Sequence, residues 1–213
     1  MTAAATPPLP CIHHAETLNG TGFEKYGKVI CPPSQGGSDM RASKPVNQGT
    51  ADKLMDLAEI KNLYPPAETA TTNVHIYVSS PTTLKQNALP FDVKVLERHR
   101  YTTQMFLPMA PGGPGPNNDG SEGYLVIVAL NGSGRWKFCS PSDDRPDLST
   151  LKGYWASPSQ GISYHPGVWH HPLIAMGTSP TIFACVVNEC SSNSPLDLDE
   201  VYYDATLAAQ YAA

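Results

Sequence analysis

Hydrophobic positions in this chain alternate with polar ones over many short segments, a pattern that predicts strands rather than helices. Val74, Ile76 and Val78 alternate with His75, Tyr77 and Ser79, as in a half-buried strand. Residues 91–99 show the same period of two, and the continuous apolar run 124–130 is typical of a central strand. Further strands are predicted at 29–30, 104–109, 153–156, 161–164, 168–173 and 181–187. We therefore expect an all-β barrel or sandwich.

Helical patterns are scarce in the sequence. Residues 17–26 fit a short helix that Thr17 or Asn19 can cap. The composition of residues 51–63 is compatible with a helix, and residues 147–152 fit one helical turn. Loops are expected at residues 31–45 and 111–123, which are rich in proline, glycine and small polar residues.

The composition agrees with this assignment. A chain of 213 residues is long enough for one domain with a sizeable core. Its 21 prolines and 17 glycines favour short strands joined by tight turns. The Ala- and Pro-rich residues 1–15 are predicted to be a mobile N-terminal segment, and residues 16–213 a single domain.

Charge and targeting signals exclude several classes of function. The net charge is −5 without a Lys/Arg cluster, so neither nucleic acid nor a membrane is an expected partner. No apolar run approaches the ~20 residues of a membrane span, and the N-terminus lacks a secretory pattern. The five cysteines form no CxxC pair, which favours free thiols in a reducing compartment. We therefore predict a cytoplasmic protein.

Three histidines are concentrated in the segment His165-Pro-Gly-Val-Trp-His170-His171. The Pro-Gly pair predicts a tight turn followed by a strand. Successive side chains of a strand point to opposite faces, so His170 and His171 cannot share a pocket. We expect His170 to be functional, and His165 and His171 to have structural roles.

A second polar cluster lies upstream of this segment. Glu97 and His99 are two residues apart in a predicted strand and therefore share a face, whereas Arg98 points away. A tight turn brings Gln104 beside them. Together with His170, these side chains predict a polar pocket inside the barrel.

This spacing resembles the cupin metal pattern His-x-His-(4)-Glu, followed far downstream by Pro-x-Gly-x-x-His. Glu97, His99, Gln104 and His170 fall on the four ligand positions, although Glu97 replaces a histidine and Gln104 a glutamate. The second motif, Pro166-Gly-Val-Trp-His170, is also one residue shorter than the pattern. Such a mixed oxygen and nitrogen set suits Mn, Fe, Ni or Zn. Two interpretations remain open: a site for one divalent metal ion, and a metal-free acid/base pocket.

A narrower resemblance follows from four segments. VLERHRYTTQMFLPM (95–109), YLVIVAL (124–130), RPDLSTLKGYW (145–155) and QGISYHPGVWHHPL (160–173) resemble the ureidoglycolate lyase family, also called ureidoglycolate hydrolase. The similarity extends over most of residues 17–203. It implies a cupin-like β-barrel (a double-stranded β-helix) with a few short helices, commonly paired as a homodimer. It also implies cleavage of (S)-ureidoglycolate to glyoxylate and urea, a step of allantoin and purine breakdown.

The resemblance also implies roles for individual residues. Glu97, His99 and His170 are the expected catalytic groups. His99 and His170 are expected to flank the reacting carbon, Glu97 to orient a histidine or act as base, and Gln104 to donate to a substrate oxygen. Asn47, Gln48 and Lys53 belong to a segment expected at the pocket mouth, where Lys53 could meet a carboxylate. Elimination of urea needs a base for the hydroxyl proton and an acid for the departing nitrogen.

The chain departs from the family pattern at three places. Val78 lies where the family usually has an arginine, and Asn188-Glu189 replaces an Asp-Arg pair. Lys53-Leu-Met-Asp-Leu replaces the Arg-Tyr-His-Asp-Leu that bacterial members often show. Two alternatives therefore stay beside the first hypothesis. One is a diverged lyase, dehydratase or isomerase acting on a secondary metabolite, and the other is a non-catalytic small-molecule-binding barrel.

Overall fold

The computed structural model describes residues 9–38, 42–81, 89–109, 123–132, 145–190 and 194–205. The predicted loop at 111–123 lies almost wholly outside these residues. So do residues 1–8 of the predicted mobile segment, whereas its last residues contribute to strands β1 and β2.

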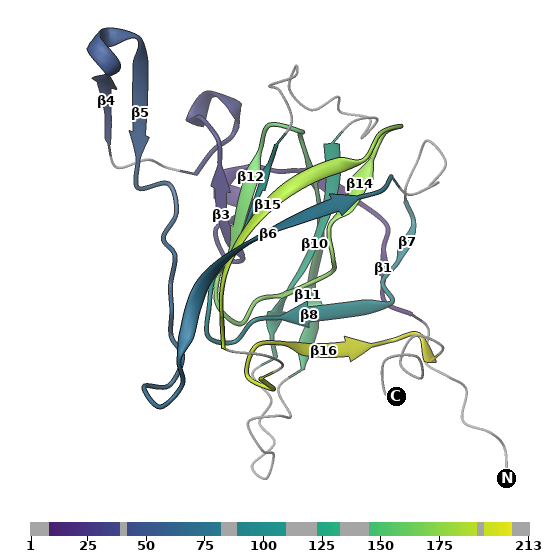
Figure 1. Cartoon of the computed structure of the whole chain (residues 1–213). Coiled ribbons are helices and arrows are strands. Elements are labelled where there is room, and N and C mark those ends of the chain that lie inside the picture. Colours follow the sequence, from purple (N-terminus) through teal and green to yellow (C-terminus); the bar gives the residue numbers. More distant parts are fainter. Residues whose placement is uncertain are drawn as a thin grey trace, which may run out of the picture.

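The described residues are mostly β-strand, which confirms the all-β prediction (Figure 1). The strands are β1 Cys11–Ile12, β2 Ala15–Thr17, β3 Gly27–Ile30, β4 Ala42–Val46, β5 Ala51–Met55, β6 Ala70–Ser79, β7 Phe91–Asp92, β8 Val95–Arg98, β9 Gln104–Pro108, β10 Gly123–Asn131, β11 Pro146–Ala156, β12 Gly161–Tyr164, β13 Trp169–His170, β14 Ile174–Met176, β15 Thr181–Cys190 and β16 Asp199–Tyr202. The helical elements are α1 Gly20–Phe23 and the 3-10 turns η1 Pro33–Gln35 and η2 Asn47–Gly49.

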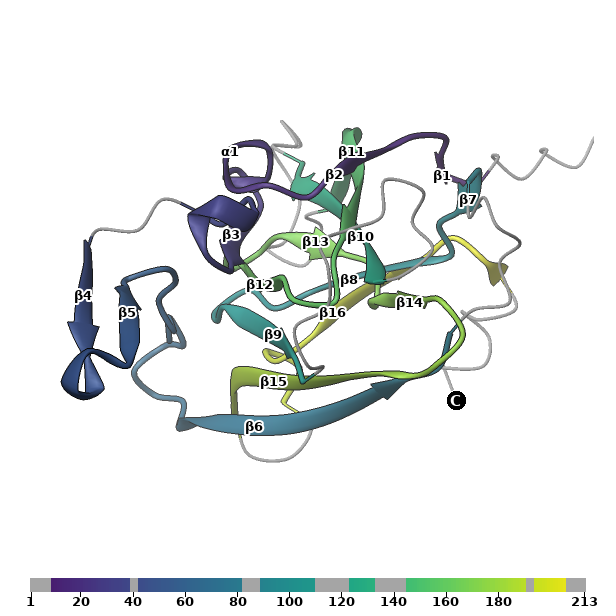
Figure 2. The same cartoon turned by 90° about the horizontal axis from the view of Figure 1, so that it is seen from above.

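Two sheets build the body of the molecule (Figures 1 and 2). The larger has the order β16-β8-β13-β10-β11-β2, with β14 also paired to β10. The smaller has the order β3-β12-β9-β15-β6. The aromatic core between them includes Tyr124, Tyr154, Tyr164 and Phe183, all almost fully buried. The sheets therefore face each other, in agreement with the predicted cupin-like architecture.

Strand β10 is the centre of the larger sheet because both of its faces are apolar. Val126 and Val128 join the core between the sheets. Leu125 and Ile127 join a second core, on the outer face of β10, that includes Leu96 of β8. This is the burial expected of a continuous apolar run in a central strand.

The helical predictions are only partly correct. Asn19 caps α1 by accepting a hydrogen bond from the Gly22 amide at 2.8 Å, but the helix is a single turn. Residues 51–55 form β5 instead of a helix, because β4 pairs with them in an antiparallel hairpin. Residues 147–152 belong to β11, where pairing with β10 and β2 overrides local composition.

Strand β6 is present as predicted, but its apolar side does not face the core. Val74, Ile76 and Val78 are 66%, 57% and 62% exposed. Their strand neighbours Asn73 and Tyr77 instead line a cavity. In the described part of the chain, no helix is both long and apolar enough to cross a membrane.

Candidate active site

Three of the predicted site residues come together because of strand pairing. Glu97 on β8 is the direct antiparallel neighbour of His170 on β13. His99 follows β8, and its ring stacks on that of His170 with centroids 6.0 Å apart. Ligand atoms of Glu97, His99 and His170 all lie within 4.8 Å of one another. Gln104, the first residue of β9, lines the same cavity as Glu97 and His99.

Backbone carbonyls fix the orientation of both imidazoles. His99 Nδ1 donates to the carbonyl of Asp197 at 2.7 Å, and His170 Nδ1 donates to that of Val168 at 3.0 Å. Because a carbonyl can only accept, each Nδ1 carries the proton. In the neutral ring, Nε2 then presents its lone pair, as a metal-ligating histidine does.

The charge on Glu97 is set by its histidine neighbours. Its Oε1 lies 3.4 Å from His170 Nε2, at ion-pair distance but without the geometry of a hydrogen bond. Burial alone would raise the pKa of Glu97, but the adjacent imidazoles, His170 first, outweigh burial and hold it below its ordinary value. Burial, and next the neighbouring His170, lowers the pKa of His99. At neutral pH, Glu97 is therefore ionised and His99 is neutral.

Two buried acceptor atoms of this cluster have no hydrogen-bond partner in the described part of the chain. They are His170 Nε2 and Gln104 Oε1. His170 itself is 2% exposed and stacks on Tyr164, with ring centroids 4.1 Å apart. Leaving such atoms unsatisfied costs about 1–3 kcal/mol each. A carboxylate, two imidazole nitrogens and an amide oxygen are all electron-pair donors, so this set fits a divalent cation.

These residues adjoin a cavity of about 610 Å³ between the two sheets. It is large enough for a small metabolite. Its wall is formed by Thr71, Asn73, Tyr77, Glu97, His99, Gln104, Glu189, Cys190, Ser194, Asp197 and Leu198. His170 is not part of this wall and reaches it through Glu97.

The sequence interpretation missed several wall residues, above all Tyr77 and Glu189. Burial raises the pKa of Tyr77 to about 12, so its hydroxyl stays a hydrogen-bond donor. Glu189 accepts hydrogen bonds from Asn73 at 2.8 Å and from His75 at 2.7 Å. Burial opposes its ionisation, but these contacts lower the pKa of Glu189 overall. The alternation of Asn73, His75 and Tyr77 along β6 is the signal in the sequence that could have found this wall.

The cavity wall is acidic. Glu97, Glu189 and Asp197 contribute carboxylates, and no described wall residue is lysine or arginine. Of the departures from the family pattern at Val78 and Asn188-Glu189, only Glu189 affects the cavity, because Val78 points outward and Asn188 is buried against Thr102. A carboxylate substrate therefore meets no cation from this part of the wall.

Three neighbouring residues make their contacts outside this cavity. Arg98 is buried away from the cavity, where it binds Asp199 at 2.8 Å and lies 4.5 Å from the Trp169 ring centre. His165 contacts the carbonyl of Glu24 at 3.2 Å. His171 contacts the carbonyl of Pro172 at 2.7 Å and packs edge-on against Phe91.

Asn47, Gln48 and Lys53 are not at the mouth of this cavity. They belong to the β4–β5 hairpin, which projects away from the body (Figures 1 and 2). Within one chain the structure therefore does not bring them to Glu97, contrary to the prediction.

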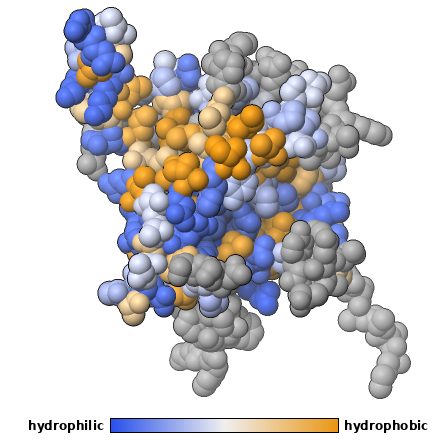
Figure 3. Space-filling view, in the orientation of Figure 1, coloured by the Kyte–Doolittle hydropathy of each residue, from blue (hydrophilic) through white to orange (hydrophobic). Residues whose placement is uncertain are grey.

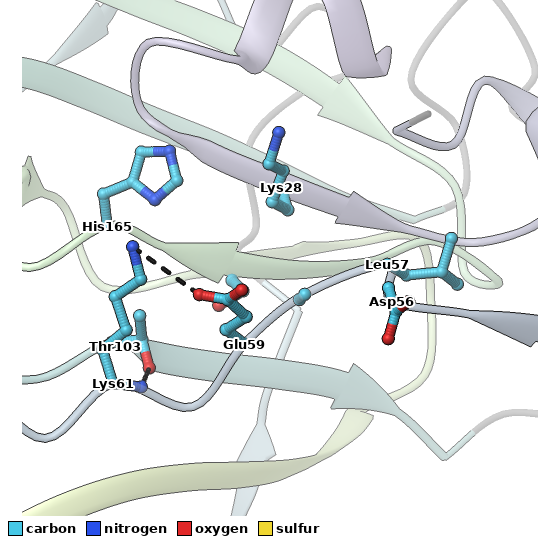
Figure 4. A pocket seen from close by; sticks show the side chains of 9 residues that line it. Lys28, Asp56, Leu57, Glu59, Lys61, Thr103 and His165 are labelled. Atoms are coloured by element: carbon cyan, nitrogen blue, oxygen red, sulfur yellow. Dashed lines mark hydrogen bonds and ion pairs between the residues drawn. The ribbon is translucent and has the colours of Figure 1, made fainter. Parts of the chain in front are cut away.

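A smaller cavity of about 190 Å³ lies at the base of the hairpin (Figure 4). Lys28, Asp56, Glu59, Lys61 and His165 are among its wall residues. Its one ion pair, Lys61 to Glu59 at 3.8 Å, is solvent-exposed. A surface pair of this kind contributes little energy, so we do not assign the chemistry here.

Comparison with known proteins identifies the family. The ureidoglycolate lyase family model matches residues 11–210. The ureidoglycolate lyase of Saccharomyces cerevisiae is 30% identical over 171 residues, covering 76% of this chain and 78% of the relative. That of Salmonella typhimurium is 35% identical over 161 residues, with the same coverage. A dTDP sugar isomerase structure from Desulfovibrio desulfuricans G20 covers 79% of this chain and 83% of its own at 18% identity and a TM-score of 0.36, too loose a match to add to the argument. The chain belongs to the ureidoglycolate lyase family.

Proposed function

We propose that this protein is a lyase that cleaves (S)-ureidoglycolate to glyoxylate and urea. Ureidoglycolate has one carbon that bears a hydroxyl, a carboxylate and a urea nitrogen. The observation that carries the proposal is the ionised Glu97 beside His99 and Gln104 in one cavity. Family membership and two relatives named ureidoglycolate lyase support it independently.

The reaction needs no net supply of protons, so one group can move the proton that it requires. Glu97 takes the hydroxyl proton, the C–O bond becomes the glyoxylate carbonyl, and the C–N bond breaks. The proton on Glu97 then passes to the departing urea nitrogen, which restores the carboxylate. Tyr77 and the Gln104 amide hydrogen-bond to substrate oxygens. His170 keeps Glu97 ionised and is a positioning residue.

A divalent cation fits the same residues. Glu97, His99 and His170 would hold it, with Gln104 Oε1 as an additional donor. When bound, it would supply positive charge next to the hydroxyl and carboxylate of the substrate, and so make the hydroxyl easier to deprotonate. Mn, Fe, Ni and Zn all accept such a mixed donor set.

An assay with racemic ureidoglycolate tests the function. We expect the purified protein to release glyoxylate and urea in equal amounts without ammonia. Release of ammonia in place of urea would indicate an amidohydrolase and contradict the proposal. Glu97→Gln, which keeps the side-chain shape, is the matched inactive control.

The acidic wall favours one second candidate, a diverged lyase, dehydratase or isomerase for a hydroxylated substrate that carries no carboxylate. Glu189 is the observation that motivates it. Turnover of uncharged analogues, together with inactivity on ureidoglycolate, would support this candidate. A non-catalytic binding barrel would show neither activity.

We also propose a homodimer in the cytoplasm, with a place in allantoin and purine breakdown. Four cysteines in the described part of the chain, Cys11, Cys31, Cys185 and Cys190, are free, which supports a reducing compartment. The exposed apolar side of β6 supports self-association, because a patch of this kind is commonly covered by a partner. Sedimentation velocity tests the dimer.

A further inference from the structure

The β4–β5 hairpin has no core of its own. None of residues 42–63 is buried, and β4 and β5 form a separate two-stranded sheet. A hydrogen-bonding link between residues 61–63 and 101–103 attaches its stem to the body. An isolated two-stranded hairpin is at best marginally stable in water. This hairpin therefore needs a surface on which to lie.

One side of the hairpin is cationic and otherwise apolar. Lys44 and Lys53 are direct cross-strand partners, so both side chains project from the same face. The remaining residues of that face, by the same register, are Ala42, Val46, Ala51 and Met55. Such a face is complementary to an acidic surface.

Strand β6 offers such a surface. It pairs with β15 on one side, and no described strand pairs with its other edge. Its outward residues Val74, Ile76 and Val78 are exposed (Figure 3 shows apolar side chains gathered where β6 crosses this face). Its inward residues line the cavity that contains Glu97 and Glu189. A long apolar edge strand is a natural place for another strand to add.

The hairpin does not lie at this edge of its own chain. Both views place the hairpin well away from β8, which carries Glu97, and from its neighbour β16 (Figures 1 and 2). We propose that the β4–β5 hairpin of each protomer lies along the free edge of β6 in a second copy, where Lys53 completes the substrate cavity. The substrate contact of Lys53 rests on the proposed function.

Charge and backbone chemistry favour a second copy over another partner. The acidic wall contains no described cation, and the hairpin carries two exposed ones, so the two surfaces are complementary within one sequence. Pro45 removes a backbone donor from β4, whereas β5 has no proline and can pair along its edge. Lys53 is on β5. In a C2 dimer, this exchange completes both cavities.

Subunit complementation tests the proposal. Lys53→Met and Glu97→Gln are made in differently tagged chains, and the heterodimer is purified from co-expression. Rates are measured with ureidoglycolate well below KM, so that kcat/KM is compared. If Lys53 acts across the dimer, one of the two sites is fully wild-type, and about half of the wild-type kcat/KM per dimer returns. If Lys53 acts within its own chain, both sites are defective and kcat/KM does not rise above that of the Lys53→Met homodimer, which would overturn the proposal.

The homodimeric variants give a second readout. Lys53→Met should raise KM by about 10- to 100-fold, the loss expected for one charge-assisted hydrogen bond. It should change kcat little, and Lys53→Arg should restore most of the binding. Lys25→Met, at an exposed lysine outside the hairpin, is the matched control and should leave KM unchanged. A purely structural role for Lys53 would not give this KM-specific, arginine-rescued loss.

Cross-linking provides a test that does not depend on activity. Lys53→Cys is treated with a short bis-maleimide, and the cross-linked peptides are identified by mass spectrometry. We expect covalent dimers that join position 53 to Cys190, a wall residue of the cavity. Lys25→Cys should not give this product. A monomeric protein, or a link from position 53 only within its own chain, would overturn the proposal even if ureidoglycolate is the substrate. Intermolecular links without activity on ureidoglycolate would contradict the proposed function alone.

Discussion

The cavity wall and the β4–β5 hairpin were both predicted to hold site residues, but they differ in how firmly the rest of the chain holds those residues. Glu97 and His170 are adjacent across a strand pair, and backbone carbonyls fix the neighbouring imidazoles. Lys53 lies in a segment without any buried residue. The comparison shows that strand pairing within one chain brings Glu97 and the two imidazoles together, whereas nothing described in the same chain packs over the hairpin that carries Lys53.

The largest expected effect is at the centre of the cavity. Glu97→Gln removes the proposed proton carrier while keeping the side-chain volume. We expect kcat to fall by about 10²- to 10⁴-fold, the range for loss of a general acid/base. Steady-state kinetics measure this, and circular dichroism checks the fold. Unchanged kcat in a folded variant would remove Glu97 from the mechanism.

Substitutions in the core and in the hairpin should also differ in how much they lower the free energy of unfolding. Ile127→Ala leaves a cavity at a fully buried position in β10 and should lower the free energy of unfolding by about 2–5 kcal/mol. Leu54→Ala, at a partly exposed position of the hairpin, should change it by less than about 0.5 kcal/mol in the dissociated monomer. Urea denaturation at low protein concentration makes the comparison. Equal losses at the two positions would mean that the hairpin has a core within its own chain.

Metal binding should distinguish the ligand set from its surroundings. Isothermal titration with Mn²⁺ should detect one ion per chain, and His99→Ala should weaken binding strongly because a ligand is lost. His171→Ala should leave binding unchanged, because His171 contacts Pro172 and Phe91 instead. Equal effects at the two histidines would contradict the assignment of His99 as a ligand.

The pH dependence of stability and of activity should follow the titration of His99. Its pKa is lowered in the folded protein, mainly by burial, so folding favours the neutral ring. The contribution of His99 to stability is therefore complete above its unfolded pKa of about 6.5 and is lost as the pH falls toward the lower folded value. Activity should fall in the same direction. Thermal unfolding between pH 5 and 8 measures the first effect, and stability that rises on acidification through this range would contradict it.

The smallest effect is expected at Val78, where the family usually has an arginine. Because its side chain points away from the cavity, Val78→Arg should not create a carboxylate-binding site. We expect kcat/KM on ureidoglycolate to change by less than about threefold, as for a surface substitution. A large gain in substrate affinity would mean that this position reaches the substrate.

Much of this molecule could be predicted from local patterns. The run 124–130 is apolar at every position and forms the central strand β10. The parity of Glu97, Arg98 and His99 correctly separates cavity residues from the buried Arg98. The family was recognisable because the segments that resemble it include the strands around the cavity.

Other features depended on partners that no local pattern reveals. Residues 51–55 have a composition compatible with a helix, but consecutive positive φ angles at Asn47, Gln48 and Gly49 turn the chain back into a hairpin. Strand β6 was predicted with its apolar side buried. In the structure the polar face of β6 lies toward the cavity instead. There His75 on β6 pairs with Glu189 on the neighbouring strand β15.

The most direct test of the central claim is a crystal structure of the protein with glyoxylate bound. We predict that glyoxylate lies in the cavity with its aldehyde carbon beside Glu97 and hydrogen bonds from Tyr77 or Gln104. Glyoxylate bound in the smaller cavity at the base of the hairpin, with the Glu97 cavity empty, would contradict the account.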